Sequence, residues 1–414
     1  MLINTWAICD EMMEDKKKIK KTDLSVIAVI PARGGSKGIP RKNITNVAGK
    51  PLIAYMIEAA KSSKFISKIF VSTDDAEIAS VAKMFNAEVI ERPSGISGDN
   101  SPSELALLNV LDHLQKNNQK KPEILVFLQC TSPLTSVDDI DQTITKLLSE
   151  KADTAFTVTP THVFLWAEDS NGEAIGINHD KKVRKMRQEC QPQYIETGSV
   201  YVMRCEGFLK NKHRFFGKTV LSVIPPERAL DIDEPADIPR AEYAIQKQKE
   251  LNKIQRLPKN IDGIVFDFDG VFTDNNVCVH DDGSEAVTCN RSDGMGITAL
   301  KKGGFPLLVM SKEKNPVVQK RCEKLGIPCA HGIDDKKTYL KTWLKTHTLN
   351  PQNIVYLGND INDIDCLTFV GCGVVVADAH EDAKMASRII LKKNGGQGAV
   401  RELCDLVLSR NNRN

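Results

Sequence analysis

Hydrophobic residues in the N-terminal half of the chain follow two alternating patterns. Short apolar runs rich in β-branched residues are typical of buried parallel strands. Between them, apolar residues spaced by three and four predict helices, the first of which contains Leu52, Met56 and Ala60. This alternation predicts a mostly parallel sheet with helices on both faces. The expected strands are 26–30, 69–72, 124–128 and 155–158, and further helices are expected at 76–85 and 103–115.

A second alternation of the same kind begins near residue 261. A charged helical stretch, 241–255, comes before it and runs into Leu257 and Pro258, a composition typical of a linker. The two halves share no visible sequence period, so we predict two separate α/β, Rossmann-like domains and no repeat. The second set of expected strands is 264–266, 307–310, 354–357 and 374–376, with helices at 295–302, 316–325 and 337–345.

Length and composition agree with this organisation. A chain of 414 residues is too long for one ordinary core, and its 41% hydrophobic and 27% charged residues indicate a globular protein. The formal net charge of +2 lacks the basic footprint of nucleic-acid binding, and no apolar run is long enough to cross a membrane. We therefore expect the protein to bind neither nucleic acid nor a membrane. The predicted division is an N-terminal extension (1–24), a first domain (25–247), a linker (248–260) and a second domain (261–410).

The cysteines and the N-terminal segment bear on the compartment. The eleven cysteines form no C-x-x-C pair, which predicts thiols in a reducing compartment rather than a zinc site or a disulfide framework. Residues 1–21 lack a secretory pattern. We expect a cytoplasmic protein, and the lysine cluster within 16–21 favours a solvated tail, with a nuclear address as the alternative if the source is an animal.

The first candidate site follows the first expected strand directly. Residues 31–43 contain three glycines, which let the backbone bend and expose N–H groups. Four cations surround them: Arg33, Lys37, Arg41 and Lys42. Such a loop at the carboxyl end of a strand suits a polyphosphate, although it is neither a Walker loop nor a dinucleotide fingerprint. A solvated basic turn is the weaker interpretation.

The segment 32–43 resembles the signature of the acylneuraminate cytidylyltransferases, also called CMP-sialic acid synthetases. Further segments match that family in order: 71–74, 128–134, the pair 187–188 followed by 194–199, and 231–233. The resemblance implies that CMP is transferred from CTP to the anomeric hydroxyl of a nonulosonic acid, with release of pyrophosphate. Positioning and charge neutralisation would supply most of the rate. The same chemistry on 3-deoxy-manno-octulosonate is an alternative, and which nonulosonic acid is used stays open.

Roles for individual residues follow from the same resemblance. Arg33 and Lys42 would be catalytic, and Arg187 would face the carboxylate of the sugar, where a guanidinium can bind in a bidentate manner. The chain departs from the family at Thr197, where an Asn usually precedes the glycine. The implied substrate-binding residues are Ser36, Lys37, Asn43, Gln129, Thr131, Ser132, Arg187, Gln188, Thr197 and Gly198.

Asp231 and Asp233 form a carboxylate pair that would bind Mg²⁺ in this family. Two carboxylates one residue apart project to the same side of an extended segment and can share a hard cation. The alternative interpretation is that they cap the following helix, which Pro235 could open.

The second candidate site begins where the expected strand 264–266 ends. Asp267 and Asp269 lie one residue apart, so one can attack phosphorus while its neighbour protonates the leaving oxygen. This segment resembles the first motif of the haloacid-dehalogenase-like phosphatases. The resemblance implies that Ser311 binds phosphate and Lys336 neutralises it. The implied Mg²⁺ ligands are Asp267, Asp269, Asn359, Asp360 and Asp363, where Asn359 replaces an Asp found in many relatives.

The segment 293–297 resembles the capless subgroup of these phosphatases, which contains 3-deoxy-manno-octulosonate-8-phosphate phosphatase and is usually tetrameric. We therefore expect a sugar-phosphate substrate, such as a nonulosonate 9-phosphate, and a homo-oligomer, either a dimer or a tetramer. The alternative is an inactive domain kept for oligomerisation. The glycine-rich segment 395–399 is expected to cap a helix or to close the site of a neighbouring subunit.

Overall fold

The computed structural model describes residues 24–411 except 37, 184–185 and 190. The chain divides into two compact units, one ending at Gln246 and the other beginning at Lys247. Lys37 and the lysine cluster within 16–21 lie outside the described residues. Each unit is described by itself.

The first unit is built on a seven-stranded sheet in the order β11-β7-β10-β6-β1-β4-β5. β1 lies inside it and pairs in parallel with β4 and β6. The prediction of a mostly parallel sheet is confirmed, although β10 runs antiparallel to both β6 and β7. The strands are β1 (Val26–Pro31), β4 (Lys68–Thr73), β5 (Glu88–Glu91), β6 (Ile124–Leu128), β7 (Thr154–Thr161), β10 (Gln193–Arg204) and β11 (Thr219–Val223).

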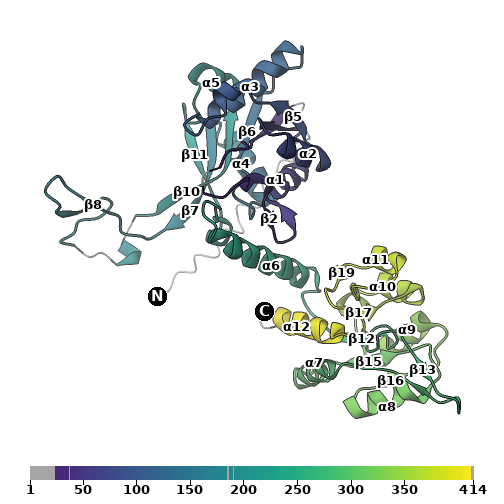
Figure 1. Cartoon of the computed structure of the whole chain (residues 1–414). Coiled ribbons are helices and arrows are strands. Elements are labelled where there is room, and N and C mark those ends of the chain that lie inside the picture. Colours follow the sequence, from purple (N-terminus) through teal and green to yellow (C-terminus); the bar gives the residue numbers. More distant parts are fainter. Residues whose placement is uncertain (1–23, 37, 184–185, 190, 412–414) are drawn as a thin grey trace. The chain divides into compact units, whose positions relative to one another are not determined.

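Side chains of β1 alternate between two hydrophobic clusters, as the period of two in a strand requires. Ala28 and Ile30 pack in one cluster with residues of α1, α2 and α4. Ile27 and Val29 pack in the other with residues of α3 and α5. Helices therefore cover both faces of the sheet (Figure 1). These helices are α1 (Leu52–Lys61), α2 (Ala76–Met84), α3 (Ser103–Lys116), α4 (Val137–Ser149) and α5 (Cys205–Asn211).

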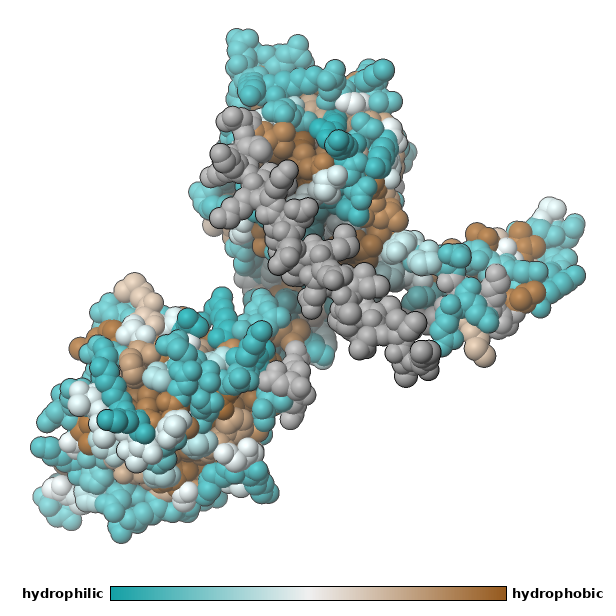
Figure 2. All heavy atoms as spheres, turned by 180° about the vertical axis from the view of Figure 1, so that it is seen from behind, coloured by the Kyte–Doolittle hydropathy of each residue, from teal (hydrophilic) through white to brown (hydrophobic). Residues whose placement is uncertain are grey.

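The segment between β7 and β10 carries a small hairpin, β8 (Trp166–Glu168) with β9 (Ala174–Gly176), which forms an arm extending from the sheet (Figure 1). Several apolar side chains on it are exposed, and Figure 2 shows brown atoms among teal ones on this arm. They include Val163, Leu165 and Ile177.

The helix α6 (Asp237–Arg256) contains the point at which the two units divide. Its residues Ala241 and Ile245 belong to a hydrophobic cluster of the first unit, and Ile254 belongs to the core of the second. Part of the predicted linker, 248–260, is therefore helical. In the part of the chain that the structure describes, no helix is long and apolar enough to span a bilayer.

The second unit is a six-stranded sheet in the order β16-β15-β12-β17-β18-β19, with every pairing parallel. Its strands are β12 (Gly263–Phe266), β15 (Leu307–Met310), β16 (Cys329–Ala330), β17 (Ile354–Gly358), β18 (Cys372–Val375) and β19 (Ile389–Ile390). Its helices are α7 (Arg291–Lys302), α8 (Pro316–Leu325), α9 (Lys336–Thr346), α10 (Ile364–Phe369), α11 (Glu381–Ala386) and α12 (Ala399–Asn411), and a hairpin joins β13 (Cys278–Val279) to β14 (Glu285–Ala286). The predicted fold class, two α/β units, is thus confirmed.

Candidate active sites

The basic glycine-rich loop follows the carboxyl end of β1, as predicted. The backbone N–H of Gly34 donates to the Asp74 carboxylate over 2.9 Å. A Cβ at Gly34 would lie 2.7 Å from a carboxylate oxygen of Asp75, so a larger residue at this position would displace the Asp75 side chain. Arg33 pairs with Asp99 at 2.9 Å, and the loop is thereby held by acidic residues from neighbouring segments.

Lys42 joins this loop to the distant pair of aspartates. Its Nζ lies 2.8 Å from the carbonyl oxygen of Ile232 and 3.1 Å from Oδ1 of Asp233. The Lys42 side chain is only 14% exposed, so its charge sits close to the protein interior. Residues 190 positions apart in sequence thus meet at one edge of the sheet.

Asn43 is buried next to Lys42 and bonds at both ends of its amide. Its Nδ2 donates to the carbonyl oxygen of Arg33 over 2.9 Å, and its Oδ1 accepts a hydrogen bond from the Cys130 thiol over 2.9 Å. Burial raises the pKa of Cys130 to about 12, so the thiol keeps its proton and acts as a donor. The loop after β6 therefore supports the loop after β1.

Asp231 lies among the predicted substrate-side residues. Ser132 Oγ lies 3.4 Å from Asp231 Oδ1. Burial raises the pKa of Asp231 and the Asp233 carboxylate raises it further, while Thr131, Lys42 and Ser132 lower it in part. A cation would relieve the cost of a buried charge here, so the donor set fits Mg²⁺.

The contacts of these aspartates favour the metal-site interpretation over helix capping. The helix α6 begins at Asp237, whose Oδ2 accepts hydrogen bonds from the backbone N–H groups of Asp233 and Glu234, which precede the helix. The side chains of Asp231 and Asp233 instead lie beside Ser132 and Lys42, respectively.

Gly198 lies in an irregular stretch of β10, where the register with β7 shifts between Glu196 and Tyr201. Its φ of +72° belongs to the left-handed region that favours glycine. A Cβ built on Gly198 would lie 3.8 Å from both Asp231 Oδ2 and Gln129 Oε1. The predicted residues Gln129 and Gly198 are therefore brought together with Asp231.

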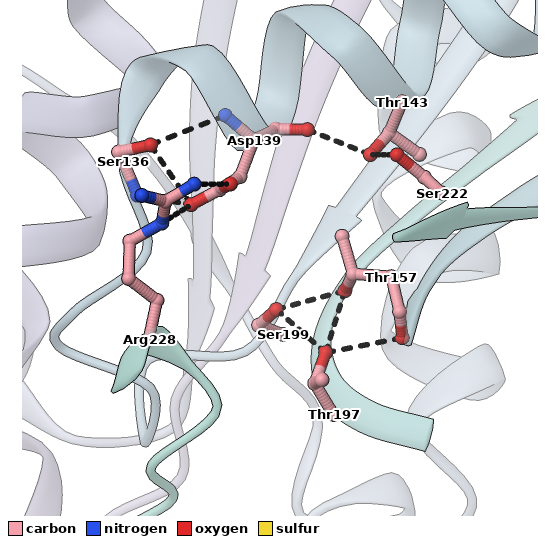
Figure 3. A network of polar contacts seen from close by, with 8 residues as sticks. All are labelled: Ser136, Asp139, Thr143, Thr157, Thr197, Ser199, Ser222 and Arg228. Carbon is pink, nitrogen blue, oxygen red and sulfur yellow. Dashed lines mark hydrogen bonds and ion pairs between the residues drawn. The ribbon is translucent and has the colours of Figure 1, made fainter. Parts of the chain in front are cut away.

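Thr197 is buried, and its hydroxyl is used inside the fold (Figure 3). It lies 2.7 Å from the hydroxyl and 3.1 Å from the carbonyl oxygen of Thr157, and 3.1 Å from the hydroxyl of Ser199. These contacts favour a role in holding the strand around Gly198 over the predicted direct contact with substrate. Figure 3 also shows the bidentate pair of Arg228 with Asp139, which supports the start of α4 nearby.

This hydroxyl cluster leads to a prediction about stability. Replacing Thr197 by valine keeps the shape but leaves the hydroxyls of Thr157 and Ser199 without that partner. We expect the first unit to lose about 1–3 kcal/mol of unfolding free energy. Urea unfolding measures this loss of free energy. The transition of the first unit is recognised as the one that CTP shifts, because a ligand stabilises the unit that binds it. Thr145→Val, which removes a half-buried helical hydroxyl, is the control, and an equal loss in both variants would contradict the prediction.

The predicted pair on the sugar side is Arg187 and Gln188, and the structure describes the side chain of Gln188 but not that of Arg187. Arg187 and Gln188 form a short 3-10 helix, η4 (Arg187–Glu189), just before β10. Gln188 is exposed, and Ser36 is half-buried in the basic loop. The predicted role of Lys37 falls outside the described residues.

In the second unit, Asp267 follows β12 and is almost fully buried. Lys336 Nζ lies 2.7 Å from Asp267 Oδ1 and 2.8 Å from Asp363 Oδ1. Burial raises the pKa of Asp267, the Asp363 carboxylate adds to this, and Lys336 opposes it. Burial lowers the pKa of Lys336, but the two carboxylates outweigh it and the net shift is upward, which keeps the ammonium charged.

Asp363 has no exposed surface, and both of its oxygens are occupied. Its Oδ1 accepts from Tyr356 Oη at 2.6 Å and from Lys336, and its Oδ2 accepts from the backbone N–H groups of Asn359 and Asp360. These contacts favour an anchoring role for Asp363 over the predicted metal ligation.

A cavity of about 660 Å³ opens in front of Asp267 and Asp269. Ser311 Oγ donates to Asp269 Oδ2 over 3.1 Å, so its hydroxyl contacts this carboxylate as well as facing the cavity. Burial raises the pKa of Asp269, which suits a general acid. The other polar residues around the cavity include Asn275, Lys312, Lys314, Asn359, Asp360 and Asn362, and also the acidic residues Glu285, Glu313 and Asp334.

Oxygen ligands for Mg²⁺ are available here in the carboxylates of Asp267 and Asp360 and the amide of Asn359. Among the described residues of either unit, no three His, Cys, Asp or Glu side chains form a cluster that could hold a metal alone. Magnesium ions in proteins usually keep several waters and share substrate phosphates, so one or two carboxylates are an ordinary number of protein ligands for this ion.

The glycine segment near the C-terminus packs against its own catalytic loop. The N–H of Gly396 donates to the Val271 carbonyl, and a Cβ at Gly395 would lie 2.1 Å from the Gly270 carbonyl oxygen. The segment then leads into α12, which begins at Ala399. Within one chain it therefore supports the loop that follows Asp269.

Comparison with known proteins identifies the family of this chain. The family model for cytidylyltransferases matches residues 27–259. Over 92% of the chain, the sequence is 31% identical to N-acylneuraminate cytidylyltransferase A of Danio rerio and 30% identical to N-acylneuraminate cytidylyltransferase of Oncorhynchus mykiss, covering 88% of each relative. The chain belongs to the N-acylneuraminate cytidylyltransferase family.

The model for haloacid dehalogenase-like hydrolases matches residues 330–403 of the same chain. A solved structure of 3-deoxy-D-manno-octulosonate 8-phosphate phosphatase from Moraxella catarrhalis, with magnesium, phosphate and KDO, is 30% identical. It covers 40% of this chain and 94% of its own, with a TM-score of 0.37. The match to the family model shows that this cytidylyltransferase carries a haloacid dehalogenase-like domain at its C-terminal end.

Sequence reasoning missed Arg92 in the cytidylyltransferase unit. Arg92 is buried, and its guanidinium donates two hydrogen bonds to the carbonyl oxygen of Ile96. Burial lowers the pKa of Arg92, Asp74 raises it and Arg33 lowers it further, which places Arg92 near the basic glycine-rich loop. A single arginine after a strand has no distinctive spacing, so only its burial identifies it.

Proposed function

We propose that the first unit transfers CMP from CTP to the anomeric hydroxyl of a nonulosonic acid of the sialic type. The sugar oxygen bonds to the α-phosphorus, the bond to the β-phosphate oxygen breaks, pyrophosphate leaves, and the hydroxyl loses its proton. The meeting of Lys42 with Ile232 and Asp233 at the end of β1 is the observation that carries this proposal.

The charge of each residue decides its proposed role: cations contact phosphate or carboxylate groups, and carboxylates hold the metal ion. Arg33, Lys37 and Lys42 neutralise the triphosphate, and Ser36 and Asn43 orient the nucleotide. Asp231 and Asp233 would hold Mg²⁺, which would offset phosphate charge when bound. Arg187 binds the carboxylate of the sugar. Gln129, Thr131, Ser132, Gln188 and Gly198 shape the remaining surface, and Thr197 holds it from behind.

Relatives that match most of the chain bear names of N-acylneuraminate enzymes, which favours a sialic acid over 3-deoxy-manno-octulosonate. Pseudaminic acid cytidylyltransferase of Campylobacter jejuni is also 31% identical, over 51% of this chain and 92% of its own. Pyrophosphate release from CTP and Mg²⁺ with N-acetylneuraminate, its deaminated analogue, legionaminate, pseudaminate and 3-deoxy-manno-octulosonate identifies the acid. Folded protein that releases none with any of them would refute the proposal.

We propose that the second unit hydrolyses a sugar phosphate, with a nonulosonate 9-phosphate as the substrate. The Asp267 carboxylate attacks phosphorus, the bond to the sugar oxygen breaks, and Asp269 protonates that oxygen. Water then attacks the aspartyl phosphate and releases inorganic phosphate. The buried contact of Lys336 with Asp267 beside the cavity carries this proposal, because a phosphoryl group needs a fixed cation there.

Asp267, Asn359 and Asp360 are the residues that would hold Mg²⁺ in this unit, where the ion would lower the repulsion between carboxylate and phosphate, while Asp269 carries the proton for the leaving oxygen. Turnover of an aryl phosphate and of N-acetylneuraminate 9-phosphate, each with Mg²⁺ and with excess chelator, tests the assignment. No turnover by folded protein would leave the alternative, a domain that serves oligomerisation.

The exposed apolar side chains on the arm between β7 and β10 support a homo-oligomer, and light scattering measures the mass of the assembly.

Asn359 provides a prediction about metal affinity. An Asn359→Asp variant adds a charged oxygen to the cavity, so the Mg²⁺ concentration for half-maximal phosphatase activity is expected to fall about tenfold. Asn362→Asp is the matched control, since Asn362 lines the same cavity but is not a proposed ligand. An unchanged Mg²⁺ requirement in Asn359→Asp, or the same decrease in both variants, would count against ligation by residue 359.

A further inference from the structure

Tyr356 lies in the core of the second unit, on the central strand β17. Its side chain has no exposed surface and is the largest fully buried side chain in the part of the chain that the structure describes. Burial, followed by the charges of Asp363 and Asp267, raises the pKa of Tyr356 well above its usual value, so the phenol keeps its proton. A buried phenol needs a hydrogen-bond acceptor, and here the acceptor is a carboxylate.

The phenol is the first member of a chain of polar contacts that ends at the nucleophile. Tyr356 Oη donates to Asp363 Oδ1 over 2.6 Å. The same oxygen accepts from Lys336 Nζ at 2.8 Å, and Lys336 contacts Asp267 Oδ1 at 2.7 Å. Tyr356 and Lys336 therefore share one oxygen of Asp363, while backbone N–H groups occupy the other.

We propose that Tyr356 is a positioning residue for the phosphatase reaction, acting through Asp363 on the ammonium of Lys336. The inference rests on the proposed phosphatase function. The hydrogen bond from the phenol satisfies part of the Asp363 charge, which leaves Lys336 free to divide its contacts between Asp363 and Asp267. Without the phenol, Asp363 depends on Lys336 alone at that oxygen and draws the ammonium away from Asp267.

Tyr356, Asp363 and Lys336 all lie behind the residues that line the cavity. Lys336 meets that lining at Asp267, while Asp363 also meets it at the backbone N–H groups of Asn359 and Asp360, so the contact of Lys336 with Asp267 is the step that the proposal concerns. The displaced ammonium would neutralise the phosphoryl group less well in the transition state than before. A purely structural role for the phenol would lower stability without changing the kcat of the protein that remains folded.

Tyr356→Phe in the full chain removes only the hydroxyl. We expect kcat for aryl phosphate hydrolysis, per folded molecule at a temperature well below unfolding, to fall about tenfold with KM nearly unchanged. The inhibition constant of orthovanadate, a phosphate analogue that would contact Lys336, is expected to rise by a similar factor. Tyr339→Phe, on α9 of the same unit, is the control and should behave as the parent protein.

An unchanged kcat and vanadate inhibition in Tyr356→Phe, with only a lower melting temperature, would overturn the inference and leave a structural tyrosine. If the parent chain itself shows no phosphatase activity, the proposed function is refuted instead. The two failures are therefore distinguished by whether the parent chain turns over. Cytidylyl transfer by the first unit, unaltered in every variant, verifies that the protein is folded and correctly quantified.

Discussion

Replacing Asp267 by asparagine is expected to lower the phosphatase kcat by at least about a thousandfold. An amide oxygen is far less nucleophilic toward phosphorus than a carboxylate, and the substitution also removes the negative charge that Lys336 meets at 2.7 Å. The change in volume is small, so the buried position is retained. Turnover of an aryl phosphate with saturating Mg²⁺ measures the effect.

Asp365→Asn is the matched control, because Asp365 is exposed and pairs with Lys337 at the surface of the same unit. Its phosphatase activity should equal that of the parent chain. Cytidylyl transfer should persist in both variants, since it belongs to the other unit. Residual phosphatase activity in Asp267→Asn close to that of the parent would place the nucleophile elsewhere.

Lys42→Ala is expected to lower kcat/KM for cytidylyl transfer by about 100- to 1000-fold. In the proposed reaction the ammonium supplies charge next to the triphosphate, and its contacts with Ile232 and Asp233 join the basic loop to the aspartate pair. The variant loses both the charge and this connection. Pyrophosphate release over a range of CTP concentrations, with the preferred sugar acid at saturation, measures the loss.

Lys83→Ala, at an exposed position near the end of α2, removes a lysine without touching the loop and serves as the control. Phosphatase activity reports that the rest of the chain is intact. If Lys42→Ala keeps most of its activity, Lys42 is a structural lysine and the triphosphate is bound by other cations.

The local pattern was sufficient to predict both α/β units and to propose where each candidate site lies along the chain. Buried strands are short apolar runs, and the loops that follow their carboxyl ends carry Arg33, Lys42, Asp267 and Asp269. These features depend on neighbouring residues alone: a strand period, glycines in a turn, and two carboxylates one residue apart. These features can therefore be predicted from the sequence without knowledge of the fold.

The antiparallel direction of β10 could not be predicted from the local sequence pattern. Its central residues are as apolar as those of a parallel strand, and its direction depends on how the preceding arm returns the chain to the sheet. The irregular stretch around Gly198 has the same origin, because the register shift exists only between two paired strands.

Contacts between distant residues decided the rest. The amino-acid sequence by itself determined the two folds, the loops and the reacting groups they carry. Only the tertiary structure decided that Lys42 meets Asp233, that the Thr197 hydroxyl is used internally, and that Asp363 anchors Lys336. The physical reason is that burial and the choice of hydrogen-bond partner depend on which strand ends the sheet brings together, and that depends on long-range packing rather than local spacing.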